Sequence, residues 1–94
     1  MRSHYLVAYD ISDPKRLRRM FRIMRGYGDP LQLSVFLCYL SDKERVLLTM
    51  DISAHINHLE DRVSIVNLGS SGVDKKIRFI GRRMAVAERT SIIV

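Results

Sequence analysis

The first 25 residues combine a mostly apolar strand, a single carboxylate and a strongly basic helix, and this unit constrains the possible folds most. The run from His4 to Tyr9 predicts a buried strand, and Asp10 ends it. Asp13 is a suitable N-cap and Pro14 suits the first helical position, so we expect a helix to begin there. A strand followed at once by a helix predicts a domain that mixes both elements.

The chain after Pro14 is typical of an amphipathic helix. Its apolar residues recur at helical spacing, and the cations fall on the opposite face. The apolar stripe is Leu17, Met20, Phe21, Met24 and Tyr27, and the basic face is Lys15, Arg18, Arg19, Arg22 and Arg25, with Arg16 on its flank. Because Lys15 and Arg16 oppose the helix dipole in the first turn, we interpret these charges as functional.

The net charge of +6 is divided unevenly along the chain. Residues 1–28 hold seven Lys or Arg against two Asp, residues 75–94 hold six against one Glu, and residues 29–74 hold three against seven acidic residues. Such segregation is expected of a surface that meets a polyanion, with solvated helix faces as the alternative. A guanidinium suits phosphate and the Asp10 carboxylate suits a divalent metal, so the sequence indicates phosphodiester chemistry or nucleic-acid binding.

Length and cysteine content narrow the class of protein. A chain of 94 residues makes one domain. The longest apolar run, Leu31 to Leu40, is too short for a membrane span, and the first residues do not open a signal peptide. The one cysteine, Cys38, has no intrachain partner, so we expect a cytoplasmic protein with Cys38 as a small core residue.

The remaining elements follow from pattern and turn chemistry. Residues 31–39 predict one bent strand or two strands joined near Ser34, and periodicity leaves both open. A capping box at Ser41 and Glu44 starts a second helix to about Leu59. Its inward stripe is Leu48, Ile52, Ile56 and Leu59, and a second apolar face of Leu47, Met50 and Ala54 could touch a partner subunit. Strands are expected at residues 62–68 and 76–80, which predicts an α+β sandwich over residues 1–81 and a tail at 82–94.

An ordered set of motifs also resembles the family of small CRISPR-associated endoribonucleases, the smaller of the two universal spacer-acquisition proteins. The motifs are YLVAYDIS at 5–12, DPKRLR at 13–18, YG at 27–28, QLSVF at 32–36, the spacing of Glu44, Leu48, Ile52 and Ile56, and DRVSI at 61–65. The resemblance spans about residues 4–81.

The resemblance implies a ferredoxin-like β-α-β-β-α-β sandwich, with an extra C-terminal strand at a homodimer interface. It implies that Asp10 of each subunit faces its mate and, as the catalytic residue, binds a divalent metal, usually Mg²⁺. Single-stranded RNA or duplex DNA and the CRISPR adaptation integrase are the implied partners. Nucleic-acid contacts are expected from Tyr9, Lys15, Arg16, Arg18, Arg19 and Arg22.

Two functional hypotheses remain open at this point. The first is a metal-dependent endoribonuclease, and the second is a non-catalytic scaffold that binds duplex DNA and bridges copies of the integrase. Pro30 and Leu37 stand where the family often has polar residues, which weakens the nuclease hypothesis more than the fold. For Asp10 the alternative is a cap at the strand end, and for His55 and His58, spaced i, i+3, a surface position is favoured over metal binding.

Overall fold

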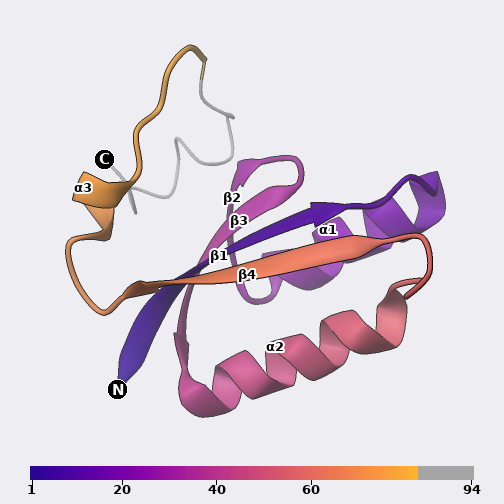
Figure 1. The fold of residues 1–94 in the computed structure, drawn as a ribbon, viewed down its shortest axis with the longest axis horizontal. Coiled ribbons are helices and arrows are strands. Elements are labelled where there is room, and N and C mark those ends of the chain that lie inside the picture. Colours follow the sequence, from indigo (N-terminus) through magenta and orange to yellow (C-terminus); the bar gives the residue numbers. More distant parts are fainter. Residues whose placement is uncertain (83–94) are drawn as a thin grey trace.

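The structure is a computed structural model, and it describes residues 1–82. Its elements, in chain order, are β1 (Arg2–Asp10), α1 (Pro14–Arg25), β2 (Gly28–Gln32), β3 (Val35–Ser41), α2 (Asp42–His55), β4 (Arg62–Gly69) and a short α3 (Val73–Lys76). The strands form a four-stranded antiparallel sheet in the order β2-β3-β1-β4 (Figure 1). Both α1 and α2 pack on one face of this sheet, so the β-α-β-β-α-β ferredoxin-type prediction is confirmed.

The main core lies between the sheet and the two helices. Alternate residues of β1 point into it, because successive side chains of a strand face opposite sides. Phe36, which is fully buried on β3, packs edge to face against Phe21 of α1, with ring centroids 5.3 Å apart. The buried residues of this core are Tyr5, Val7, Tyr9, Ile11, Met20, Met24, Phe36, Cys38, Leu40, Leu48 and Ile52, with Phe21 and Tyr27 packed against them. This confirms the core position of Cys38 and the predicted stripe of α1 except for Leu17, which is 37% exposed.

The other face of the sheet is also apolar. Leu31, Leu37 and Val73 form a second buried cluster there, with Leu6, Val35, Leu68, Ile77 and Phe79 packed around it. Val66 of β4, which pairs with Leu6, remains 46% exposed. This face, called the open face below, is therefore only partly covered by α3 and the segment that follows it.

The structure decides between the alternatives left open for residues 31–39 and moves the end of the second helix. Residues 31–39 belong to two strands joined at Leu33 and Ser34, because the edge strand β2 and β3 pair as a hairpin. Helix α2 ends at His55, since Ile56 already has extended backbone angles. Leu59 is consequently 97% exposed in the turn before β4 and does not belong to the inward stripe.

The predicted final strand at residues 76–80 is wrong. Lys76 ends α3, and residues 77–80 pair with no strand in the described part of the chain. Glycines at 69 and 72, both with positive φ, turn the chain so that Val73 and Ile77 pack on the open face instead of extending the sheet. The tail predicted at 82–94 lies, apart from its first residue, outside the described residues. No helix among residues 1–82 is long and apolar enough to cross a membrane.

Gly28 offers a sharp test of this packing. A Cβ added at Gly28 would lie 2.4 Å from the Leu37 carbonyl oxygen and 2.6 Å from Cys38 Sγ, so Gly28→Ala should force the hairpin apart. We expect it to lower the free energy of unfolding by about 1–3 kcal/mol or more in urea titrations. Gly26→Ala is the matched control, because its Cβ meets only the Ile23 carbonyl oxygen, at 3.3 Å; an equal loss in both variants would contradict the packing described here.

Candidate functional site

Asp10 is an exposed carboxylate at the end of the central strand β1. It pairs in register with Arg62 of β4 and follows the buried Tyr9, so strand alternation directs it to the open face of the sheet. Within residues 1–82 its carboxylate forms no hydrogen bond or ion pair. The alternative interpretation of Asp10, as a cap of the strand end, therefore finds no support among these residues.

The described residues contain no complete metal site. Among residues 1–82 no group of three or more His, Cys, Asp or Glu side chains could hold a metal ion. Mg²⁺ accepts one or two carboxylates and keeps several of its waters, so an exposed and unpaired Asp10 fits it as a single ligand.

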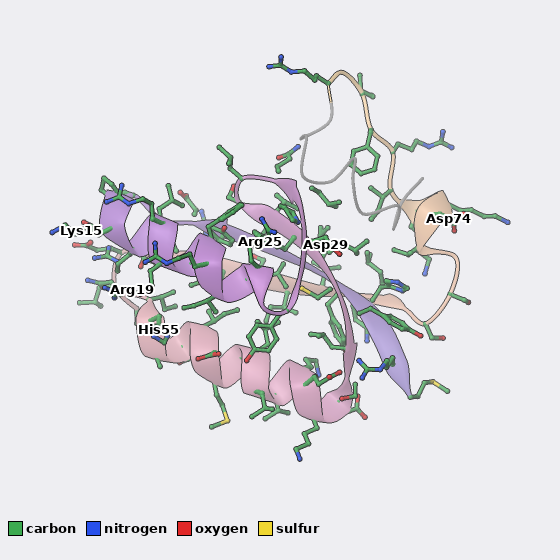
Figure 2. The ribbon with its side chains drawn as sticks, turned by 180° about the vertical axis from the view of Figure 1, so that it is seen from behind. Lys15, Arg19, Arg25, Asp29, His55 and Asp74 are labelled. Atoms are coloured by element: carbon green, nitrogen blue, oxygen red, sulfur yellow. The ribbon has the colours of Figure 1, made fainter. Side chains whose placement is uncertain are left out.

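Helix α1 presents the predicted basic face to solvent. Lys15, Arg18, Arg19, Arg22 and Arg25 are all exposed, and Figure 2 shows Lys15, Arg19 and Arg25 along the helix. None of the five forms an ion pair with a carboxylate of the described residues. Their charges are therefore free to meet an external anion.

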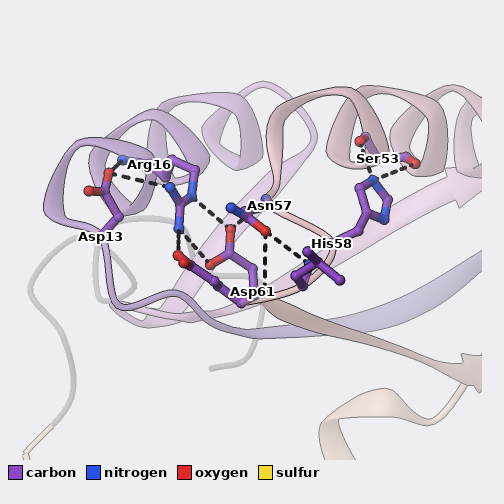
Figure 3. Close-up of polar contacts among 8 residues, drawn as sticks. Asp13, Arg16, Ser53, Asn57, His58 and Asp61 are labelled. Carbon is purple, nitrogen blue, oxygen red and sulfur yellow. Dashed lines mark hydrogen bonds and ion pairs between the residues drawn. The ribbon is translucent and has the colours of Figure 1, made fainter.

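Arg16 differs from these cations because it is held by acidic side chains (Figure 3). Its Nε donates to Asp61 Oδ2 at 2.9 Å, and its Nη2 donates to Asp61 Oδ1 at 3.2 Å and to Glu60 Oε1 at 3.0 Å. The Asp61 side chain is fully buried, and Oδ2 also accepts from the Asn57 backbone N–H at 2.8 Å. The Arg16 guanidinium lowers the pKa of the Asp61 carboxyl, and the Asn57 N–H adds to this effect.

These contacts change the interpretation of the charge at the start of α1. Asp13 is the N-cap, as predicted, and accepts from the Arg16 backbone N–H at 2.9 Å. The Arg16 side chain ties this end of the helix to the turn between α2 and β4, so the turn's acidic residues offset the unfavourable charge of Arg16 near the helix dipole. Lys15 keeps the functional interpretation, and Arg16 has a structural role.

Tyr9 is buried, as expected for the predicted strand, and this bears on the nucleic-acid contact expected from it. Its side chain is 6% exposed, and its hydroxyl donates to the Leu33 carbonyl oxygen at 2.8 Å. Burial raises the pKa of Tyr9 to about 12, so the hydroxyl stays protonated near neutral pH and remains a donor. With its ring packed in the core, Tyr9 positions the β2–β3 turn and offers no free face for stacking on a base in this structure.

The two histidines of the predicted i, i+3 pair make separate local contacts. His55 Nδ1 lies 2.8 Å from the Asp51 carbonyl oxygen, and His58 Nε2 lies 2.8 Å from that of Ser53. His58 lies beyond the end of α2, so the two rings do not share the helix face that the spacing assumed.

The sequence interpretation missed the contacts of Glu60 and Asp61 with Arg16. These residues lie 44 and 45 positions from Arg16, and no local pattern joins them. An acidic pair in a turn between a helix and a strand was the only signal present.

The fold and the site together define a ferredoxin-type protein with an exposed basic face on α1 and an isolated carboxylate at the end of β1. The family model described as CRISPR associated protein Cas2 matches residues 2–76. The chain therefore belongs to the Cas2 family.

Relatives and solved structures agree with this assignment. The chain is 38% identical over 91 residues to the CRISPR-associated endoribonuclease Cas2 1 of Rhodospirillum rubrum, covering 96% of this chain and 89% of that protein. It is 40% identical over 91 residues to the CRISPR-associated endoribonuclease Cas2 of Geobacter sulfurreducens, covering 96% of each. The crystal structure of Streptococcus pyogenes Cas2 at pH 6.5 superposes with a TM-score of 0.77 at 28% identity, covering 83% of this chain and 99% of that one.

The Arg16–Asp61 pair predicts a pH-dependent contribution to stability. Asp61→Asn keeps the shape but removes the buried charge, so we expect the melting temperature at neutral pH to fall by several degrees. Because the folded pKa of Asp61 is lowered, this contribution is complete above the unfolded value of about 3.9 and is lost as the pH falls through the lower folded value. Thermal melts of the two proteins should therefore still differ at about pH 4 and converge only in stronger acid, below the lowered folded pKa of Asp61.

Glu60→Gln is the matched control for this measurement. Glu60 contacts the same guanidinium but its side chain is 60% exposed, so the variant should melt close to the unchanged protein. A difference between unchanged protein and Asp61→Asn that persisted into strong acid would contradict the electrostatic account.

Proposed function

We propose that this protein is a metal-dependent endoribonuclease of spacer acquisition, which hydrolyses phosphodiester bonds of single-stranded RNA or of duplex DNA. The observation that carries the proposal is the Asp10 carboxylate, exposed and without a partner among residues 1–82. The family membership and the names of the relatives, which are CRISPR-associated endoribonucleases, support it. The reduced, buried Cys38 fits a cytoplasmic setting.

The proposed active form is a homodimer that joins two copies of Asp10 at one metal. The open face supports this assembly, because Val66 is 46% exposed and Tyr39 50% exposed on the same side of the sheet as Leu6. Asp10 lies at the end of this face. A symmetric contact through it can bring the two carboxylates together, since each subunit uses the same surface.

The chain's own residues then have limited and separate tasks in the reaction. Asp10 supplies a carboxylate oxygen as the metal ligand, and the cations of α1 hold the phosphate backbone by charge. A bound divalent ion supplies charge stabilisation at the phosphate and acidifies a water. Tyr9 remains protonated and does not take part as a base.

A DNA-binding scaffold that bridges the adaptation integrase is the second candidate function. One observation favours it: the unpaired cations lie on α1, in the helix layer, whereas Asp10 belongs to the opposite face of the sheet. Pro30 and Leu37, which replace residues that are often polar in the family, are both buried packing residues. A scaffold would need the arginines and the dimer but not the carboxylate.

The basic face predicts a strong salt dependence of binding. If Arg18 and Arg22 contact phosphates, the double variant Arg18→Ala and Arg22→Ala should reduce the slope of log affinity against log salt by about one to two units. Fluorescence anisotropy over a salt series measures this slope. Lys43→Ala removes one exposed cation from α2 and serves as control. An unchanged slope in the arginine variant would show that the binding surface lies elsewhere than on α1.

Asp10→Asn separates the two candidate functions. It removes the charge that attracts a divalent metal while keeping the side-chain shape, so Mg²⁺-dependent cleavage of RNA or DNA should fall at least a hundredfold. Binding and the dimer mass, near twice 10.9 kDa by light scattering, should remain. Asp74→Asn changes another exposed aspartate, on α3, and should cleave normally.

Three outcomes of this experiment decide between the candidates. Cleavage retained in Asp10→Asn would reject Asp10 as the metal ligand. Binding without cleavage in the unchanged protein would favour the scaffold. A mass near that of a single chain would contradict a metal shared between two subunits.

A further inference from the structure

An apolar hollow of about 350 Å³ lies beside the basic face of α1. It is lined by Leu17, Arg18, Phe21, Arg22 and Leu33, so three apolar side chains form its walls and two arginines its rim. Leu33, at the tip of the β2–β3 turn, is 71% exposed and Leu17 is 37% exposed. Apolar side chains left this exposed next to unpaired cations indicate a binding surface.

The walls of this hollow are held in place by the core. Phe21 packs edge to face against the fully buried Phe36, so its ring is a fixed platform. The carbonyl oxygen of Leu33 accepts the hydrogen bond of Tyr9, and the Ser34 carbonyl oxygen accepts from the Tyr9 backbone N–H at 3.0 Å. The turn that carries Leu33 is thus bonded to the end of β1, one residue before Asp10.

The charges at the rim are free. Arg18 and Arg22 are one helical turn apart, and neither has a carboxylate partner within residues 1–82. No acidic side chain of residues 1–82 lines the hollow. An occupant should therefore combine a flat or apolar group with negative charge on both sides of it.

We propose that this hollow holds one unstacked nucleobase of a single-stranded nucleic acid, with Arg18 and Arg22 on its flanking phosphates. The proposal rests on the proposed function and adds to it a preference for single strands at this helix. A nucleotide chain places a charge beside every base, which matches an apolar site between two cations. A duplex cannot fill the hollow, because its bases remain paired and stacked inside the helix.

The lining also predicts how selective the site is. Apart from the rim arginines, its described lining offers no side chain that can hydrogen-bond to the edges of a base. Contact with Phe21 and the two leucines uses the face of the base, which all bases share. The site should therefore accept any base.

Leu33→Ser tests the proposal, because it removes one wall but leaves the carbonyl oxygen that Tyr9 holds. The probes are a short fluorescent single-stranded RNA, an abasic strand of the same length and a duplex, each titrated with EDTA present so that none is cut. Leu17→Gln alters a second wall with a good helix former. Leu59→Ser changes a leucine that is 97% exposed in the α2–β4 turn and is the matched control.

We expect Leu33→Ser and Leu17→Gln each to lower the binding affinity for single-stranded RNA by about fivefold. The slope of log affinity against log salt should stay unchanged, because a base contact releases no counterions. The abasic strand and the duplex should bind all four proteins equally. An equal loss of affinity for every probe, or no loss of affinity for the RNA, would overturn the proposal. The hollow would then be a contact site for a side chain of a partner protein. In that case salt-dependent binding by the unchanged protein still supports the proposed function, whereas its absence rejects both.

Discussion

The alternation of side chains along β1 governs most of the architecture. This strand is central, pairing with β3 on one side and β4 on the other, so its two faces are the two faces of the whole domain. Tyr5, Val7 and Tyr9 are buried against the helices, and the next residue, Asp10, is turned away from them. A shift of one residue in the pairing of β1 with its neighbouring strands would bury the Asp10 carboxylate and expose Tyr5 and Tyr9. The core and the candidate metal position therefore depend on the same strand register.

The second organising feature is that the cations of α1 have two different roles, one structural and the others open to an external anion. Arg16 forms ion pairs with the buried Asp61 and with Glu60, and these contacts hold the α2–β4 turn against the start of the helix. The other cations have no such partners among residues 1–82 and extend into solvent. Because one arginine is satisfied internally, the helix is anchored while the rest of its charge remains available for a polyanion.

The β2–β3 turn connects these two features. Tyr9 reaches it from β1 and holds Leu33 through a hydrogen bond, while Phe21 of α1 contacts Phe36 at the start of β3. The exposed Leu33 is thereby set beside Arg18 and Arg22. An aromatic residue in the core thus acts on the surface indirectly, through the backbone of a turn.

The sequence by itself determined the elements whose signals are local. The Asp13 cap, the Ser41 and Glu44 capping box, the two faces of α1 and the apolar strands follow from neighbouring residues. The order of these elements favoured an α+β sandwich, and the family resemblance implied its ferredoxin-like form. Tertiary structure decided the rest: the internal pairing of Arg16, the hydrogen bond from Tyr9 to the Leu33 carbonyl oxygen, and the conformation of residues 77–80, which lack a strand partner in the described chain. The physical reason is that caps and amphipathic faces arise from interactions within a few residues, whereas ion pairs across 45 residues and strand pairing depend on which elements the fold brings together.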